Sequence, residues 1–117
     1  MGKLTTHVLN TAQGKAAAGM KIEFSVLEGA AWKLLKTIHT NNDGRTDAPL
    51  LADDALRTGQ YQLVFHVADY FQRSGVNLPN PPFIDQVPLQ FGVADAGAHY
   101  HVPLLCSPWA YSTYRGS

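Results

Sequence analysis

Hydrophobic and polar residues alternate along much of the chain with a period of two, the pattern of strands that have one buried face and one outer face. The clearest segments are residues 21–26, 61–67 and 87–93. Weaker alternation covers residues 4–9, 32–40, 99–105 and 109–115. Pro88 falls within one of these segments, and a proline in a sheet favours an edge strand or a bulge. The pattern predicts seven or eight short strands.

Turn-forming residues separate these segments. Residues 41–44, with the sequence Asn-Asn-Asp-Gly, predict a tight turn because these residue types tolerate positive φ. The proline-rich residues 79–82 predict a loop. One short helix is expected over residues 69–74, with Asp69 capping its N-terminus and Gly75 ending it. Many short strands separated by turns favour a β-sandwich.

Alternation also assigns side chains to the outer faces of the predicted strands. Tyr100, Val102 and Leu104 share an apolar face, so His99 and His101 are expected to point the other way.

The first and last predicted strands add further polar groups. Leu4 and Val8 are expected in the core, so His7 points outward. Arg115 and Ser117 share one face of the last strand and are predicted to extend this polar set. Whether the three strands belong to one sheet stays open at this point. Polar residues on an outer sheet face are usually just solvated, which is the alternative interpretation.

The composition limits the classes of function. A chain of 117 residues is long enough for one domain, expected over residues 1–117. Nine basic residues balance nine acidic ones, so the chain lacks the basic excess that nucleic acids or anionic membranes attract. No segment approaches the roughly 20 apolar residues of a membrane span. The first residues lack the apolar region of a signal peptide, so we expect a cytoplasmic protein. A periplasmic or peroxisomal location would follow if a targeting segment had been removed.

The candidate metal ligands are few. Cys106 is the only cysteine, which excludes an intramolecular disulfide and a multi-cysteine metal site. The spacing of His99 and His101 resembles a two-ligand metal clamp, but carboxylates are scattered along the sequence. We expect neither a metal nor an organic cofactor.

The C-terminal residues 114–117, Tyr-Arg-Gly-Ser, resemble the terminal signature of 5-hydroxyisourate hydrolases, which are transthyretin-like proteins. Three further segments resemble motifs of the same family in the same order, namely residues 4–11, 43–45 and 99–105. The resemblance therefore extends over the whole chain. Asn10 and Ala16 depart from the family pattern, which usually has Asp and often has Pro at these positions. Both departures concern the turn after the first strand.

The resemblance implies an all-β fold, a transthyretin-like (prealbumin-like) β-sandwich of two four-stranded sheets with one short helix. It implies hydrolysis of 5-hydroxyisourate to 2-oxo-4-hydroxy-4-carboxy-5-ureidoimidazoline in urate degradation, a part of purine catabolism. It also implies a homotetramer with active sites at a dimer–dimer interface. The implied catalytic residues are His7, Arg45, His101 and Ser117. The implied substrate-binding residues are His7, Arg45, Tyr114, Arg115, Gly116 and Ser117.

The implied reaction suits these residue types. Water must lose a proton as it attacks the ring carbonyl, and a histidine has a pKa near working pH. An arginine nearby disfavours the protonated histidine and offers a planar set of donors to the substrate. The sequence leaves open whether His7 or His101 is the general base.

Two other classes of protein remain as alternatives. A transthyretin-like carrier of a small aromatic ligand could share the fold, because function depends on the site rather than on the fold. A structural adhesion-like β-sandwich would use its edge strands for contacts. Neither class requires His7, Arg45 and His101 together with the Tyr-Arg-Gly-Ser end.

Overall fold

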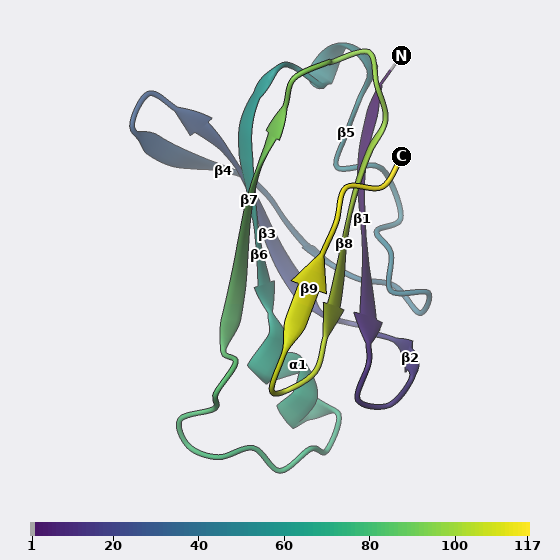
Figure 1. The fold of residues 1–117 in the computed structure, drawn as a ribbon, viewed down its shortest axis with the longest axis vertical. Coiled ribbons are helices and arrows are strands. Elements are labelled where there is room, and N and C mark those ends of the chain that lie inside the picture. The colour runs from purple at the N-terminus through teal and green to yellow at the C-terminus, as the bar shows by residue number, and fades with distance from the viewer. Residues whose placement is uncertain (1) are drawn as a thin grey trace.

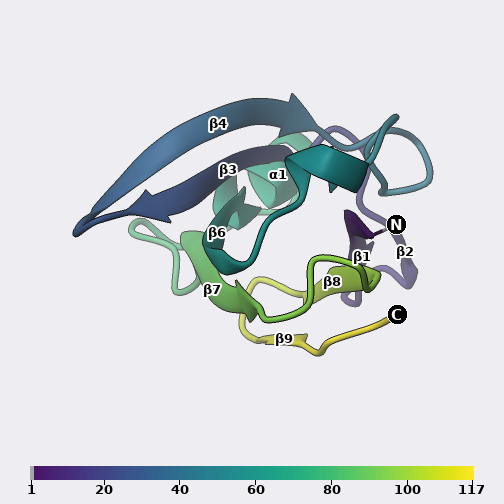
Figure 2. The same ribbon diagram turned by 90° about the horizontal axis from the view of Figure 1, so that it is seen from above.

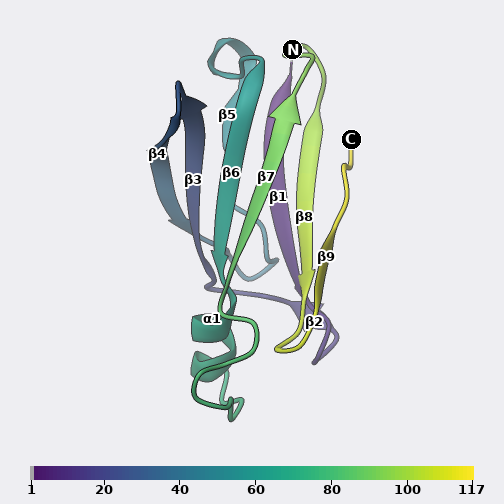
Figure 3. The same cartoon turned by 60° about the vertical axis from the view of Figure 1, so that its left-hand side comes forward.

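The structure, a computed structural model, describes residues 2–117 as two packed β-sheets with one helix at one end (Figures 1 and 3). One sheet has the order β4-β3-β6-β7 and is antiparallel throughout. Its strands are β3 (Lys21–Glu28), β4 (Ala31–His39), β6 (Gly59–His66) and β7 (Gln86–Val93). The other sheet has the order β2-β1-β8-β9, with β5 also paired to β1. Its strands are β1 (Lys3–Asn10), β2 (Lys15–Ala16), β5 (Leu51–Ala52), β8 (Tyr100–Cys106) and β9 (Tyr111–Thr113).

The predicted β-sandwich is confirmed, and all seven segments of alternating residues contain strands. The sequence pattern missed β2 and β5, because two residues each are too few to show alternation. These short strands give one sheet five strands where four were expected. Pro88 lies in β7, which is an edge strand among residues 2–117, as predicted.

β1 and β8 run parallel in the centre of their sheet, although they come from opposite ends of the chain. Their register pairs Thr5 with His101 and His7 with Pro103. Figure 2 shows the two sheets as separate layers, and the core lies between them. Buried residues from both sheets include Leu4, Val8, Ile22, Phe24, Leu63, Phe65, Val102 and Leu104.

The helix α1 (Val67–Arg73) follows β6 and lies at one end of the sandwich (Figure 1). It begins two residues before the predicted start, because Val67 is buried against the core. Asp69 therefore lies in the first turn rather than at the N-cap, which is His66, so the predicted cap is wrong. The predicted end is confirmed, since Ser74 is the C-cap and Gly75 follows with a φ of 90°. Within residues 2–117, no helix is long and apolar enough to cross a membrane.

Candidate active site

His7 and His101 lie close together on the outer face of the sheet that contains β1 and β8. Their ring centroids are 6.0 Å apart, and the ring planes are tilted by 34°. Both side chains alternate with buried neighbours along their strands, so the two histidines emerge on the same face. The predicted outward direction of both residues is therefore confirmed. Both are half-buried rather than fully solvated.

The turn at residues 41–44 brings Arg45 to the same place. The backbone of Arg45 forms an antiparallel bridge with His7. Asn41 shapes the turn, because its side-chain oxygen accepts hydrogen bonds from the backbone N–H groups of Asp43 (2.9 Å) and Arg45 (3.1 Å). The tight turn predicted from the sequence thus has a specific task, which is to place an arginine beside β1.

Gly44 is the point where this turn meets β1. Its carbonyl accepts a hydrogen bond of 2.8 Å from the backbone N–H of Val8. Its φ is 74°, and a Cβ at this position would lie 2.4 Å from the Val8 carbonyl oxygen. Only glycine fits such a close approach with a positive φ. The glycine before Arg45 is therefore required by the geometry that delivers the arginine.

The surroundings of the two histidines favour their neutral forms. Burial lowers the pKa of His7 below 6.5, and the positive charge of Arg45 and the neighbouring His101 lower it further. Burial and then Arg45 also lower the pKa of His101. Either imidazole can therefore accept a proton at neutral pH. Arg45 contributes to both shifts, so its guanidinium acts on the pair as a whole.

The C-terminal tail approaches His101 from the side opposite β1. Gly116 and His101 form an antiparallel bridge, with Gly116 N–H donating to the His101 carbonyl (2.7 Å) and His101 N–H donating to the Gly116 carbonyl (3.2 Å). A Cβ on Gly116 would lie 3.1 Å from Cβ and 3.2 Å from Cδ2 of His101. Ser117 follows directly and is exposed. The tail therefore pairs with His101 through Gly116, and continuing this register carries Ser117 opposite Tyr100, so its predicted outward direction is not confirmed.

Arg115 does not face the histidines, so the predicted outward direction of this residue is wrong. The β8–β9 register continues past Thr113 so that Arg115 falls on the inner side of the sheet, the side of Tyr100 rather than of His101. Its Cζ lies 4.3 Å from the centre of the Tyr100 ring, and its Nη2 donates to the His99 carbonyl (3.1 Å). Arg115 therefore anchors the tail in this structure.

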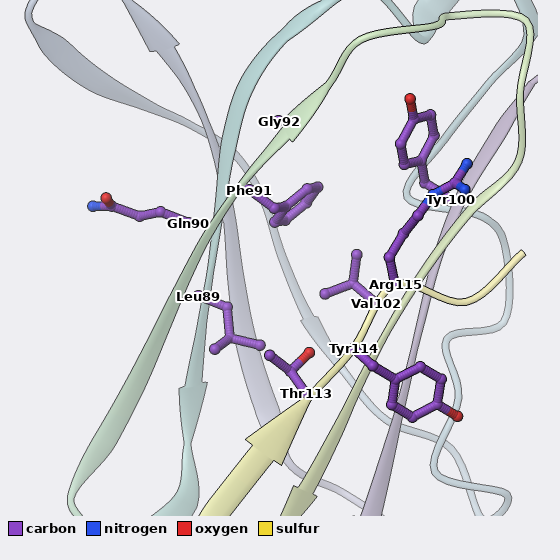
Figure 4. Close-up of a pocket in the computed structure, with 9 residues that line it drawn as sticks. All are labelled: Leu89, Gln90, Phe91, Gly92, Tyr100, Val102, Thr113, Tyr114 and Arg115. Carbon is purple, nitrogen blue, oxygen red and sulfur yellow. The ribbon is translucent and has the colours of Figure 1, made fainter.

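Figure 4 shows the Arg115 side chain beside Tyr100, whereas the exposed Tyr114 ring points away from both. Arg115 and Tyr100 border a cavity of about 370 Å³ that opens between β7 and β9. Its apolar lining residues include Leu89, Phe91 and Val102. Neither site histidine lines this cavity. A hollow of about 180 Å³ adjoins Thr5 and Arg45. The histidine pair itself lies on an open sheet face.

Thr5 is a site residue that the sequence reasoning missed. Its Oγ1 lies 2.8 Å from Nδ1 of His101, within hydrogen-bond distance. Thr5 lies between the buried Leu4 and Thr6, so it shares the outer face of β1 with His7. The contact with His101 depends on the parallel register of β1 and β8, which no local pattern contains.

The remaining candidate ligands are dispersed. His99 lies just before β8 and is exposed. His66 belongs to the other sheet, where its Nε2 is 2.6 Å from Oε1 of Glu23. Among residues 2–117, no three histidine, cysteine or carboxylate side chains are grouped so that they could hold a metal ion.

The sequence and the fold are similar to those of known proteins of one family. Residues 4–116 match the family model described as the HIUase/Transthyretin family. The chain is 60% identical over 116 residues to the 5-hydroxyisourate hydrolase 2 of Rhizobium meliloti (strain 1021), covering 99% of this chain and 97% of that protein. The structure of Klebsiella pneumoniae 5-hydroxyisourate hydrolase is similar with a TM-score of 0.81 and 32% identity over the full length of both chains. An (S)-allantoin synthase is similar with a TM-score of 0.94 and 42% identity, covering 99% of this chain but 44% of that one.

Proposed function

The chain belongs to the HIUase/Transthyretin family, and we propose that it hydrolyses 5-hydroxyisourate to 2-oxo-4-hydroxy-4-carboxy-5-ureidoimidazoline. The curated relatives at 60% and 56% identity, which align over nearly the whole chain, are named 5-hydroxyisourate hydrolases. The observation that carries the proposal for this chain is the convergence of His7, His101 and Arg45 on one sheet face.

We propose that the histidine pair activates the attacking water. One imidazole accepts a proton from water as the water oxygen bonds to the ring carbonyl carbon of the substrate. The C–N bond of the cyclic amide then breaks, and the departing nitrogen takes up the proton that the imidazole received. The lowered pKa values of both rings keep a neutral base available near pH 7.

Arg45 is proposed to orient the substrate and to stabilise charge. Its guanidinium stays protonated and presents a planar set of donors that suits the carbonyl edge of a urate-like ring. Negative charge that grows on the carbonyl oxygen during attack is stabilised by such a donor. The same charge disfavours imidazolium formation beforehand. Arg45 therefore acts on the base and on the substrate with one positive charge.

The tail is proposed to complete the site. Ser117 is proposed to supply a hydroxyl that can bond water or substrate, and the bridge between Gly116 and His101 fixes the backbone just before it. Tyr114 is exposed and is proposed to contact substrate at the rim. The predicted substrate contact of Arg115 is replaced in this proposal by an anchoring role, because its guanidinium is engaged with Tyr100 and the His99 carbonyl.

We propose further that the protein works as a homotetramer. The histidines lie half-buried on a sheet face, where a substrate would be held from one side only. A second subunit over this face would exclude solvent, which strengthens electrostatic interactions in the site. Exposed aromatic side chains at Phe83 and Trp109, stacked at 6.1 Å, also offer surface for association. Multi-angle light scattering checks this proposal, and a monomer across the working concentration range would contradict it.

The activity is tested by generating 5-hydroxyisourate from urate with urate oxidase and following its ultraviolet decay. The purified protein should accelerate decay above the spontaneous rate, whereas a carrier would bind urate-like ligands without turnover. His7→Ala and His101→Ala should each lower kcat/KM by about 10²-fold or more, the scale of general-base loss. His66→Ala, on the other sheet, is the matched control and should keep the wild-type rate. Full activity in both site variants would refute the proposed roles.

A further inference from the structure

Thr5 sits beside His101 in the next strand, and its hydroxyl is within hydrogen-bond distance of one ring nitrogen. The parallel pairing of β1 and β8 makes Thr5 and His101 direct neighbours, and Oγ1 lies 2.8 Å from Nδ1. We propose that Thr5 is a positioning residue that holds the His101 imidazole with Nδ1 engaged and with Nε2 as the nitrogen that exchanges protons in the site. The proposal rests on the hydrolase function given above.

The opposite edge of the same ring is also restricted. A Cβ on Gly116 would lie 3.2 Å from Cδ2 of His101, so the tail backbone closely flanks this edge. Nδ1 and Cδ2 are the two ring atoms attached to Cγ, and each therefore has a neighbour, Thr5 on the β1 side and Gly116 on the tail side. The distal atoms Cε1 and Nε2 are left to project from the sheet. The ring is thus held between the first strand and the last residues.

A hydroxyl at Nδ1 controls the chemistry of the other nitrogen. Which imidazole nitrogen is protonated depends on the hydrogen bond that its partner nitrogen makes. For Nε2 to act as a base, Nδ1 must carry the proton of the neutral ring, and the Thr5 hydroxyl then accepts from Nδ1 in both the neutral and the charged state. Burial and then Arg45 lower the pKa of His101. A hydrogen bond to Nδ1–H is stronger when the ring is charged, so on this proposal loss of the Thr5 hydroxyl would lower that pKa further.

Within residues 2–117, two charged or titratable side chains lie near His101, namely Arg45 and His7. Arg45, from the turn at residues 41–44, lowers the pKa of His101, and His7 lies across from it on β1. Thr5 is neutral, so a substitution at this position changes a hydrogen bond without changing the charge of the site.

The experiment compares Thr5→Val, which removes the hydroxyl at nearly constant shape, with Thr5→Ser, which keeps it. Thr6→Val is the matched control, because the Thr6 hydroxyl bonds the Val102 carbonyl (2.7 Å) on the buried face of the same strand. We measure kcat/KM against pH with enzymatically generated substrate. In parallel, ring-nitrogen NMR of the full-length protein gives the pKa and tautomer of His101.

Thr5→Val should lower kcat/KM about tenfold, the scale of one net hydrogen bond of about 1.4 kcal/mol. It should also lower the pKa of His101 and mix its neutral tautomers, while Tm stays near that of wild type. Thr5→Ser should restore all three properties. Thr6→Val should lower Tm and leave the pKa and tautomer of His101 unchanged.

The proposal is overturned if Thr5→Val keeps the wild-type tautomer and pKa of His101, or if Thr5→Ser behaves like Thr5→Val. Absence of substrate hydrolysis by the wild-type protein would contradict the proposed function instead. The NMR comparison would then still decide whether Thr5 positions the ring, so the two failures are distinguishable.

Discussion

A methyl group added at Gly116 should detach the C-terminal tail from His101 without unfolding the sandwich. In Gly116→Ala the new Cβ would lie 3.1 Å from Cβ, 3.2 Å from Cδ2 and 3.3 Å from the carbonyl oxygen of His101. All three distances are shorter than an ordinary van der Waals contact. His101 belongs to a central strand and is held by its pairing with β1 on the other side, so the tail is the partner that has to move.

The size of the effect follows from the contacts that hold the tail. Its two backbone hydrogen bonds to His101 contribute about 1 kcal/mol each, and the exposed stacking of Arg115 on Tyr100 contributes about 0.5–1 kcal/mol. Overpacking by one methyl group typically costs about 1–3 kcal/mol. The strain is therefore comparable with the anchorage, so Ser117 should leave its place in a large fraction of molecules. Equal strain and anchorage would leave about half of the tails in place, so we expect kcat/KM to fall about two- to fourfold.

The assay is the ultraviolet decay of enzymatically generated substrate, combined with thermal unfolding of the same preparations. The strain or the lost anchorage, about 1–3 kcal/mol, also lowers the free energy of unfolding, so Tm of Gly116→Ala should fall by roughly 3–10 °C. Gly92→Ala is the control, since a Cβ there meets no atom within 4 Å. Wild-type kcat/KM in Gly116→Ala would contradict the expected displacement of the tail. A loss of Tm well beyond this range would also contradict it, because the sheet rather than the tail would then have moved.

Three further outcomes follow from the structure. Arg45→Met removes the charge that lowers the pKa of both site histidines, so these pKa values should rise and the acidic limb of kcat/KM should move to higher pH; a limb that stays in place would contradict this electrostatic role. Gly44→Ala forces a Cβ to within 2.4 Å of the Val8 carbonyl oxygen at a φ of 74°, and urea unfolding should show a loss of about 2 kcal/mol or more. Burial raises the pKa of the Cys106 thiol to about 12, so it should react with a disulfide reagent only as fast as the protein unfolds, and rapid labelling under native conditions would count against this.

The outward histidines were predictable because alternation is a local property of a half-buried strand. Leu4 and Val8 around His7, and Val102 and Leu104 after His101, form the apolar face that fixes the direction of both histidines once each segment is extended. The turn before Arg45 was predictable for a similar reason, since glycine and asparagine have well-defined backbone preferences.

The direction of Arg115 could not be predicted from the alternation of buried and outward residues. β9 ends at Thr113, and all three of its residues are exposed, so the tail has no buried face from which an outward direction could be inferred. Its orientation depends on the pairing with β8, and Arg115 consequently turns to Tyr100 on the inner side. Thr5 was missed for the same kind of reason, because its partner lies 96 residues away in the sequence.

The parallel pairing of β1 with β8 has a consequence for the order in which the protein can be built. During synthesis, β3, β4, β6 and β7 can pair once residue 93 has been made, since their partners all lie within residues 21–93. β1 must wait for residues 100–106, and contacts between such distant segments form late because a long loop has to close first. Until then β1 lacks its central partner and is a candidate for incorrect pairing. The candidate active site is therefore among the last parts of the molecule to form, because it needs residues 100–106 to join the first strand and Gly116 to pair with His101.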